Sequence, residues 1–422
     1  MQQRHAKRLI RQLRGLLPDA GAARRLCLLT AVQSAGSGVF LSSSVIFFSR
    51  YAGLSPTQVG LGLAVAGGVG FLATVPAGRL ADRFRPRSLL ALGYSALVPL
   101  FISYGFVRTF PAFIAAASLI SVCETTGSPL RATLMHQLFR EEGAVRVRAQ
   151  MRSFFNVGYM LGAAVASIAL TVGTSRAFYA VLLLNALAQA CCVYIVLSVR
   201  VPAAAPRAAP PRKGMRGALS NVPFLALTAV NGILELHYTI FTVGVPLWIV
   251  THAHVPAGLN SVVIALDTVL VILLQVPLSR GTGTLAEGAN QMRRGAWFMA
   301  IACAVYALSQ SSSEVVAICF LLVGTVILVF GEIFQSAGSW TISFKLPPAG
   351  KQGEYQGVYA LGRGVREFAG PALLTALIVP LAWCGWIVLM AIFLALSTLV
   401  GPLAEMAERH ASRAVVEPTP SR

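Results

Sequence analysis

Long apolar segments, separated by short polar stretches, follow one another from residue 25 to residue 403. Most have the roughly 20 residues that an α-helix needs to cross the hydrocarbon core of a bilayer. The short segments of alternating polarity that are typical of barrel strands are absent from the sequence. The pattern therefore predicts an all-α membrane protein with twelve spans, at residues 25–50, 57–80, 88–108, 111–138, 149–173, 177–199, 221–250, 257–280, 294–311, 314–343, 355–380 and 382–403.

The composition agrees with a chain surrounded by lipid. Hydrophobic residues make up 56% of the 422 residues and charged residues only 12%, against about 25% charged residues in an average soluble domain. The net charge of +19 is also typical of nucleic-acid-binding proteins. Here the basic residues lie between apolar segments, where they set membrane topology, so we expect a lipid bilayer as partner and no nucleic acid.

The positions of the basic residues predict the orientation. With both termini placed inside, 28 of the 34 Lys and Arg residues fall in cytoplasmic tails and loops, and three fall outside. This imbalance favours an even number of spans and cytoplasmic termini. Only four of the 34 are Lys, and Ala is abundant, which is typical of a high-GC bacterium. We therefore expect a multi-pass protein of the bacterial cytoplasmic membrane.

A proline-rich and basic stretch at 200–219 is the longest polar interruption, and it predicts a cytoplasmic linker. The expected organisation is a basic N-terminal tail (1–24), a six-helix bundle (25–199), the linker (200–219), a second six-helix bundle (220–404) and a C-terminal tail (405–422). Tail residues 4–14 suit either a basic helix on the anionic inner leaflet or a solvated charge run.

Two pairs of segments in the two halves of the chain resemble each other. Gln150–Gly158 resembles Gln356–Gly364, and Pro76–Arg79 resembles Pro277–Arg280. These matches predict a duplicated transporter that rocks around a midplane site.

The loop after the second span reads GRLADRFRPR at residues 78–87. It resembles the G-x-x-x-D-R-x-G-R-R/K signature of the major facilitator superfamily, although Arg85 and Pro86 depart from that pattern. The resemblance implies the twelve-helix fold of that superfamily and a monomer. Gly78 allows close helix approach, and Asp82 can accept hydrogen bonds from a helix N-terminus or from an Arg of the other half. We therefore expect a conformational latch formed by Gly78, Asp82, Arg83 and Arg87, in which the two arginines form ion pairs across the cytoplasmic face.

Small residues recur in the fifth and eleventh spans. Gly158-Tyr-Met-Leu-Gly162-Ala163 resembles the G-x-x-x-G-P signature of proton-coupled drug antiporters, with Ala163 in place of the proline. Gly370 and Pro371 are its expected counterpart in the other half. Small residues four apart let helices pack closely, and generic helix packing explains the pattern nearly as well as an antiporter does.

Five acidic residues lie inside predicted spans, away from the span ends, where a charge is costly unless it is paired or solvated: Glu124, Glu235, Asp267, Glu332 and Glu367. Burial favours the protonated form of a carboxylate, which is the property that a proton carrier needs. We expect the proton carriers among Asp267, Glu235, Glu332 and Glu124. The same carboxylates could instead bind a cationic substrate. All five acids lie in helices that, by the family resemblance, line the cavity, while spans three, six, nine and twelve face outward.

Charged and polar neighbours extend this candidate site. Arg363 and Glu367 are four residues apart on one helix face and are expected to pair, with Arg366 adjacent. Arg131 can attract an anionic group or an acid of another helix. His237 is interpreted as a proton relay or as a hydrogen-bonded packing residue. Further cavity candidates are Gln33, Asn156, Asn231, Tyr238, Gln275 and Gln335, together with Ser34, Ser37, Tyr359, Trp248 and Trp340. Interfacial anchoring is the alternative for the two tryptophans.

The sequence contains neither a G-x-x-x-x-G-K-[ST] phosphate loop nor an H-E-x-x-H motif. His252 and His254 form only a weak metal pair. We therefore expect no enzyme activity, no metal and no cofactor, with a proton gradient as the energy source. The predicted function is proton-coupled efflux, by alternating access, of small organic molecules such as amphipathic drugs or sugars. The alternatives are an importer or uniporter of a sugar, amino acid or other metabolite, and a transport-inactive scaffold or sensor.

Overall fold

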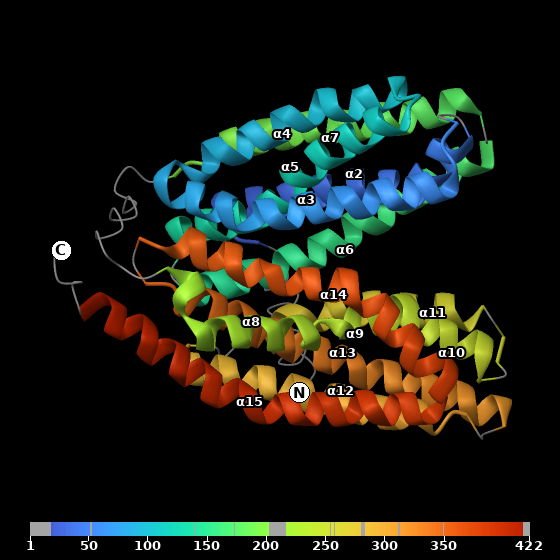
Figure 1. Cartoon of the computed structure of the whole chain (residues 1–422), viewed down its shortest axis with the longest axis vertical. Coiled ribbons are helices and arrows are strands. Elements are labelled where there is room, and N and C mark those ends of the chain that lie inside the picture. Colours follow the sequence, from blue (N-terminus) through green and yellow to red (C-terminus); the bar gives the residue numbers. More distant parts are fainter. Residues whose placement is uncertain are drawn as a thin grey trace, which may run out of the picture. The chain divides into compact units, whose positions relative to one another are not determined.

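The computed structural model describes residues 18–50, 53–139, 141–172, 174–201, 217–253, 255–256, 258–279, 283–310, 313–348 and 350–416. Within these ranges every regular element is a helix (Figure 1). Tail residues 4–14, linker residues 202–216 and His254 lie outside the described residues.

The chain divides into two compact units. The first contains residues 1–140 and 150–211, together with the short segment Ala349–Gly357. Its helices are α2 (Ala22–Arg50), α3 (Pro56–Arg83), α4 (Pro86–Ser103), the 3₁₀ turn η1 (Tyr104–Phe106), α5 (Phe110–Leu138), most of α6 (Glu141–Val172) and α7 (Ser175–Ser198).

The second unit contains Glu141–Ala149, Arg212–Pro348 and Val358–Arg422. The first residues of α6 therefore group with the second unit, and the first residues of α14 group with the first unit. The elements of the second unit are η2 (Ala218–Ser220), α8 (Val222–Leu234), α9 (Leu236–Thr239), the π-helical turn η3 (Ile240–Gly244), α10 (Val245–Thr251), α11 (Leu259–Leu278), α12 (Leu285–Ala307), α13 (Glu314–Lys345), most of α14 (Gln352–Leu381) and α15 (Trp383–Val416).

Several helices begin at a side-chain cap. Ser55 accepts a hydrogen bond from the Gln58 backbone N–H, while the Gln58 side chain accepts from the Ser55 N–H. Thr284 and Glu287 form the same reciprocal box at the start of α12. These contacts satisfy backbone N–H groups that the first helical turn leaves without a partner. Interior prolines, including Pro76 and Pro129, do not end their helices, because packed neighbours compensate for the missing donor.

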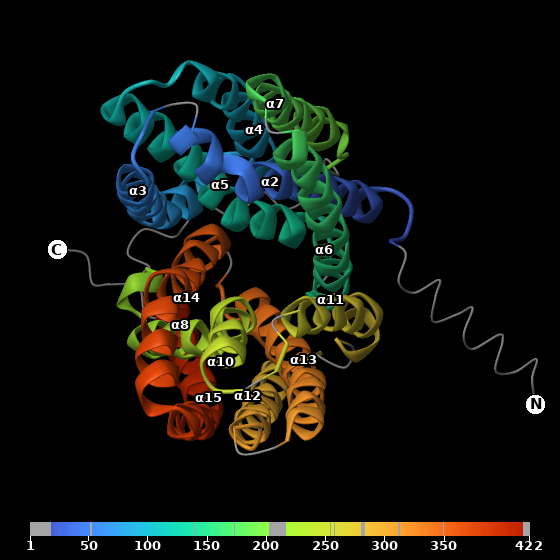
Figure 2. The same cartoon turned by 90° about the vertical axis from the view of Figure 1, so that its right-hand side faces the viewer.

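Each unit has its own aromatic core. The first unit contains a cluster of contacting aromatic rings, in which Phe40 stacks on Tyr104 and the other contacts are edge-to-face or tilted; its members are Phe40, Phe48, Phe101, Tyr104 and Phe113. Helices α4 and α7 lie side by side in both views (Figures 1 and 2), as do α3 and α5. In the second unit, α12 packs against α13 and α15. The core there centres on Trp248, Tyr306 and Trp386.

All twelve predicted spans fall on helical segments, and nine segments of the described part are long and apolar enough to cross a membrane. Helices α2, α6 and α12 are not among the nine, so the count of twelve and the cytoplasmic termini stay predictions. Several boundaries differ from expectation. Helix α6 begins at Glu141 and α12 at Leu285, ahead of the expected residues 149 and 294. The predicted span 221–250 is broken into α8, α9, η3 and α10. Helix α15 continues to Val416, well into the stretch expected as a tail.

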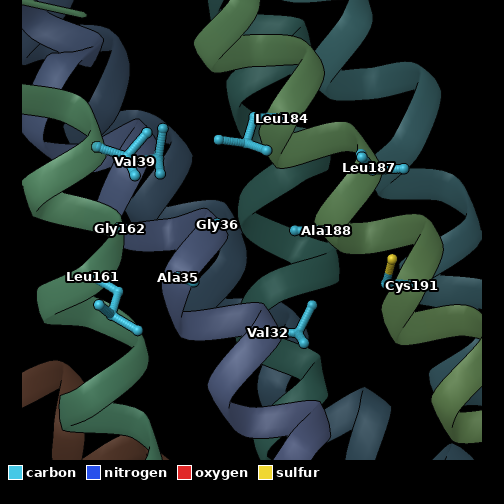
Figure 3. Close-up of a pocket in the computed structure, with 11 residues that line it drawn as sticks. Val32, Ala35, Gly36, Val39, Leu161, Gly162, Leu184, Leu187, Ala188 and Cys191 are labelled. Carbon is cyan, nitrogen blue, oxygen red and sulfur yellow. The ribbon is translucent and has the colours of Figure 1, made fainter. Parts of the chain in front are cut away.

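An open groove of about 290 Å³ lies between α2, α6 and α7 (Figure 3). Its lining consists of Val, Ala, Gly, Leu and Cys residues, including Gly36, Gly162 and Cys191. Leu161, Leu184 and Leu187 at its rim are exposed. The groove contains no polar side chain that could bind a proton or a polar group.

Candidate functional site

Asp82, near the end of α3, holds the start of α14. Its two carboxylate oxygens accept hydrogen bonds from the backbone N–H groups of Gly353, at 2.6 Å, and Glu354, at 2.8 Å. These are among the first N–H groups of α14, which have no partner within the helix and lie at the positive end of its dipole. The helix N-terminus is therefore the partner of Asp82 in this structure.

Two further contacts surround that pair. A Cβ atom on Gly78 would lie 2.1 Å from the carbonyl oxygen of Gly353, so only glycine fits there. Arg79 donates to one carboxylate oxygen of Glu354 at 3.0 and 3.2 Å. Arg87 instead donates to the carbonyl oxygen of Leu197 near the end of α7. Arg83 is exposed, and an ion pair of Arg83 or Arg87 is absent from the described part of the chain.

The small residues of α6 lie where this helix crosses α2. A Cβ on Gly158 would lie 2.3 Å from the carbonyl oxygen of Ala31, and one on Gly162 would lie 2.1 Å from that of Ala35. In the second unit, a Cβ on Gly370 would lie 2.8 Å from the hydroxyl oxygen of Thr239. Pro371 next to it is exposed. The glycines therefore allow close helix approach in both units.

Arg131 of α5 is the centre of a polar cluster in the first unit. One guanidinium nitrogen donates to the Gln33 side-chain oxygen at 2.5 Å and to the Tyr94 hydroxyl oxygen at 2.8 Å. The Tyr94 hydroxyl in turn donates to Gln33 at 3.0 Å. Glu124 interacts electrostatically with Arg131. The cluster thus joins α2, α4 and α5, and it keeps one guanidinium beside neutral partners and one acid.

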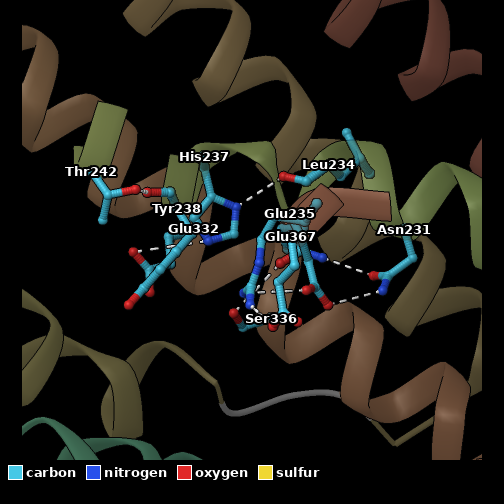
Figure 4. A network of polar contacts seen from close by, with 11 residues as sticks. Asn231, Leu234, Glu235, His237, Tyr238, Thr242, Glu332, Ser336 and Glu367 are labelled. Atoms are coloured by element: carbon cyan, nitrogen blue, oxygen red, sulfur yellow. Dashed lines mark hydrogen bonds and ion pairs between the residues drawn. The ribbon is translucent and has the colours of Figure 1, made fainter. Parts of the chain in front are cut away.

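The second unit contains a larger network beside a break in helical geometry (Figure 4). Helix α8 ends at Leu234, the short α9 follows Glu235, and η3 adds a π-helical turn at Ile240–Gly244. Such turns occur frequently at functional sites. The break redirects the side chains that lie on either side of Glu235.

Glu235 joins three elements of this network. The Asn231 amide donates to one Glu235 carboxylate oxygen at 3.2 Å, and the Gln335 amide of α13 donates to the Asn231 oxygen at 2.8 Å. The other Glu235 oxygen lies 3.6 Å from a guanidinium nitrogen of Arg366 on α14. Glu235 is therefore linked to α14 directly and to α13 through the Asn231 amide.

Arg366 also contacts Glu367, at 2.7 Å, and lies 4.8 Å from the centre of the Tyr238 ring. The side chains of Arg366 and Glu235 are mostly buried, with 17% and 20% exposed, whereas 52% of Glu367 is exposed. Glu367 pairs with Arg366, and the expected pair of Arg363 with Glu367 stays a prediction. One guanidinium thus lies between two carboxylates and an aromatic ring.

His237 and Glu332 form a second titratable pair. Their side chains are 5% and 2% exposed, and His237 Nε2 lies 4.0 Å from a Glu332 carboxylate oxygen. His237 Nδ1 lies 2.9 Å from the Leu234 carbonyl oxygen, so it must carry a proton to donate there. A neutral His237 therefore presents the Nε2 lone pair to Glu332. One proton can be held by either group of this pair.

Other predicted residues lie outside these clusters. Asp267 of α11 is half-buried and interacts electrostatically with Tyr306. Buried Gln275 donates to the Ser279 hydroxyl at 3.0 Å, and Asn156 is half-buried on α6. Trp248 is fully buried and donates to the Ser309 hydroxyl at 2.7 Å. Trp248 is therefore a core residue rather than a cavity wall or an interfacial anchor.

Two residues of these clusters, Tyr94 and Arg366, were not among the candidate site residues expected from the sequence. Tyr94 comes from the third span, which was expected to face outward. Arg366 was noted only as a neighbour of the expected Arg363–Glu367 pair. The charge of Arg366 inside an apolar segment was the signal that could have identified it. Among the described residues, no group of three or more His, Cys, Asp or Glu side chains is placed to hold a metal ion.

Comparisons with known proteins agree with this architecture. The family model of the Major Facilitator Superfamily matches residues 26–371, whereas no curated protein matches the chain. The structure of FucP in the outward conformation aligns with a TM-score of 0.64 and 15% identity, over 90% of this chain and 98% of that chain. A second structure of FucP, the E. coli fucose:proton symporter, gives a TM-score of 0.62 and 14% identity with the same coverage. The structure of the human organic anion transporter MFSD10 (TETRAN) aligns with a TM-score of 0.61 and 14% identity, again over 90% of this chain and 98% of that chain. The chain therefore belongs to the major facilitator superfamily, and it is a multi-pass membrane transporter rather than an enzyme.

Proposed function

We propose that this transporter couples proton entry to the efflux of small organic molecules across a bacterial cytoplasmic membrane. The observation that carries the proposal is the Glu235–Arg366–Glu367 cluster at the helix break. A proton carrier needs a carboxylate whose protonation changes the contacts of a mobile element. Glu235 meets this requirement, because it contacts side chains of α8 and α14 directly and α13 through one amide.

Protonation of Glu235 removes one of the two negative charges that hold Arg366. The guanidinium then keeps Glu367 and the Tyr238 ring as its partners. The Glu235–Asn231–Gln335 chain must also rearrange, since a protonated carboxyl group acts as a donor as well as an acceptor. In this mechanism the proton shifts the position of α14 relative to α8.

The His237–Glu332 pair supplies a second place for a proton, on α9 and α13. Substrate with a cationic or hydrogen-bonding group competes with the proton for these carboxylates. Proton entry from outside then favours substrate release, and proton loss to the cytoplasm favours substrate binding. Asp267 and Glu124 remain carrier candidates with contacts outside this network.

Export is proposed from the resemblance of Gly158–Ala163 to the antiporter signature. The close approach of α6 to α2 at Gly158 and Gly162 supports it, because a Cβ atom at either position would clash with backbone atoms of α2. Ala163 in place of the signature proline favours the second candidate, a proton-coupled importer or uniporter of a sugar, amino acid or other metabolite.

Reconstituted protein with a trapped pH dye tests the proposal. An imposed proton gradient is applied while amphipathic cations, antibiotics and sugars are added in turn. Proton movement opposite to the flux of a substrate supports antiport, and movement in the same direction supports the importer. Substrate movement that is independent of the gradient contradicts proton coupling in either direction.

A further inference from the structure

Arg148, near the start of α6, lies over two aromatic rings of α13. Its guanidinium carbon is 5.8 Å from the centre of the Trp340 ring and 5.4 Å from that of the Phe344 ring. Both distances are within the roughly 6 Å range of cation–π attraction. Trp340 and Phe344 are four residues apart and thus share one face of α13.

The surroundings of this contact favour a guanidinium over other cations. Phe344 is 1% exposed, and both Arg148 and Trp340 are half-buried. Tyr359 of α14 also interacts electrostatically with Arg148. A planar and weakly hydrated guanidinium stacks on aromatic faces better than a compact ammonium does, and the attraction grows as water is excluded.

The internal repeat gives this contact a counterpart. The match of Gln150–Gly158 with Gln356–Gly364 places Arg148 at the position of Glu354. Glu354, at the start of α14, pairs with Arg79 of α3 at 3.0 Å. The first residues of α6 and of α14 therefore carry a charged side chain at equivalent positions. Each of these side chains is bound by another helix of its own unit, α13 for Arg148 and α3 for Glu354.

We propose that Trp340 and Phe344 form a guanidinium-binding site whose ligand is Arg148, and that this site is a second cytoplasmic anchor. It holds the start of α6 on α13, as Asp82 and Arg79 hold the start of α14 on α3. The proposal rests on the alternating access of the proposed function, because both anchors must open in the same step. It requires neither a particular substrate nor a direction of transport.

The two anchors differ in their sensitivity to salt. The Arg79 side chain is 53% exposed, so added salt screens its attraction to Glu354. The Arg148 contact is formed with apolar ring faces, one of which is almost fully buried. Salt therefore weakens the α14 anchor more than the α6 anchor.

The accessibility of a buried residue next to Arg148 reports on this anchor. Ala144 of α6 is 1% exposed, so Ala144→Cys is shielded from a water-soluble maleimide while the anchor is closed. The experiment uses the full chain in nanodiscs, with Cys123, Cys191, Cys319 and Cys384 replaced by Ser. The three buried cysteines, Cys27, Cys192 and Cys303, stay in place, and Cys303 is the control for unfolding of the second unit.

Arg148→Ala is expected to speed labelling at position 144 by about tenfold. This is the change in the equilibrium between closed and open anchor that the loss of a partly desolvated cation–π contact produces. Trp340→Leu is expected to act in the same way, and Arg148→Lys less strongly. Arg146→Ala is the matched control, because Arg146 is exposed and only two residues away. Guanidinium at about 0.1 M, the dissociation constant that corresponds to a tenfold effect, should restore slow labelling in Arg148→Ala, whereas methylammonium at the same concentration should not.

Equal labelling rates in Arg148→Ala and Arg146→Ala overturn the proposal. Guanidinium rescue in the double variant that carries both Arg148→Ala and Trp340→Leu also overturns it, because the proposed binding site is then incomplete. Labelling of Cys303 in Arg148→Ala would show that this variant unfolds. Arg148→Lys and Trp340→Leu then test the proposal, and wild-type labelling rates at position 144 in both of them overturn it. The readout needs no substrate and no proton gradient. A failure of the anchor is therefore distinguishable from a failure of proton-coupled efflux.

Discussion

Gly78 and Gly353 meet backbone to backbone, and a Cβ atom on Gly78 would lie 2.1 Å from the Gly353 carbonyl oxygen. Asp82, one helical turn later on α3, reaches the N–H groups of Gly353 and Glu354 because of this approach. A carboxylate is favoured at the positive end of a helix. The contact between α3 and α14 therefore depends both on a missing side chain and on an acid.

Gly78→Ala should force α3 and α14 apart, since the new methyl group would meet backbone atoms that cannot rotate away. Overpacking of this kind costs about 1–3 kcal/mol. We expect a lower transport rate in proteoliposomes and greater water accessibility of a cysteine introduced at the start of α14. Gly68→Ala is the control on the same helix, because its Cβ would meet nothing within 4 Å. Equal effects of the two substitutions would show that the close approach is unimportant.

Asp82→Asn tests the acid separately from the packing. The amide keeps one acceptor oxygen but loses the charge and the second acceptor. A hydrogen bond to a charged group contributes about 1.5–3 kcal/mol, which corresponds to roughly a tenfold or larger shift in conformational balance. Spin-label distances between α3 and α14 measure that balance, with the exposed Arg83→Gln as control. An unchanged distance distribution and transport rate would exclude a latch at Asp82.

Glu235→Gln should separate substrate movement from proton movement. The glutamine mimics the protonated acid, so the attraction to Arg366 is lost in every state of the cycle. Gradient-driven accumulation is expected to fall to background, while exchange of substrate down its own gradient persists. Glu405→Gln serves as the comparison, because Glu405 is exposed and pairs only with Arg409 among the described residues. Intact gradient-driven transport in Glu235→Gln would assign the carrier role to another acid.

Tyr94→Phe should destabilise the first unit and loosen Arg131. The hydroxyl accepts from Arg131 and donates to Gln33, and each lost hydrogen bond costs about 1 kcal/mol. Thermal unfolding in detergent measures the loss. Tyr179→Phe is the comparison, because the Tyr179 hydroxyl also accepts one hydrogen bond and donates another, from Arg108 and to the Gly105 carbonyl oxygen, at a more exposed position. A smaller loss for Tyr94→Phe than for Tyr179→Phe would contradict the structural role of the Arg131 cluster.

Apolar periodicity was enough to predict where the helices lie, because lipid demands about 20 apolar residues for each span. It did not predict the break after Leu234, since a π-helical turn changes hydrogen bonding without changing the apolar pattern. The charged residues inside spans could be selected as candidates from the sequence, because a charge in the membrane has a high free-energy cost and therefore indicates a function. The partners of Arg366 could not be predicted in this way. Sequence spacing describes only one helix, whereas Arg366 of α14 contacts both Glu367 and Glu235, which lies between α8 and α9.

The sequence allowed two partners for Asp82, a helix N-terminus or an arginine, and in the structure Asp82 binds the N-terminus of α14. The contact of Tyr94 with Arg131 could not be predicted from the sequence. Its helix was assigned outward by the family resemblance, and only the folded first unit brings its hydroxyl to Arg131. Trp248 shows the opposite case, because an aromatic residue near a span end is buried against Trp386.

The most direct test of proton-coupled efflux is simultaneous recording of proton and substrate flux in proteoliposomes, for the wild type and for Glu235→Gln. A substrate found in the screen is loaded on one side, and internal pH is followed as it moves. We expect proton flux opposite to substrate flux in the wild type and no substrate-linked proton flux in Glu235→Gln. Proton flux in the same direction as substrate, or equal coupled flux in both proteins, would contradict proton-coupled efflux through Glu235.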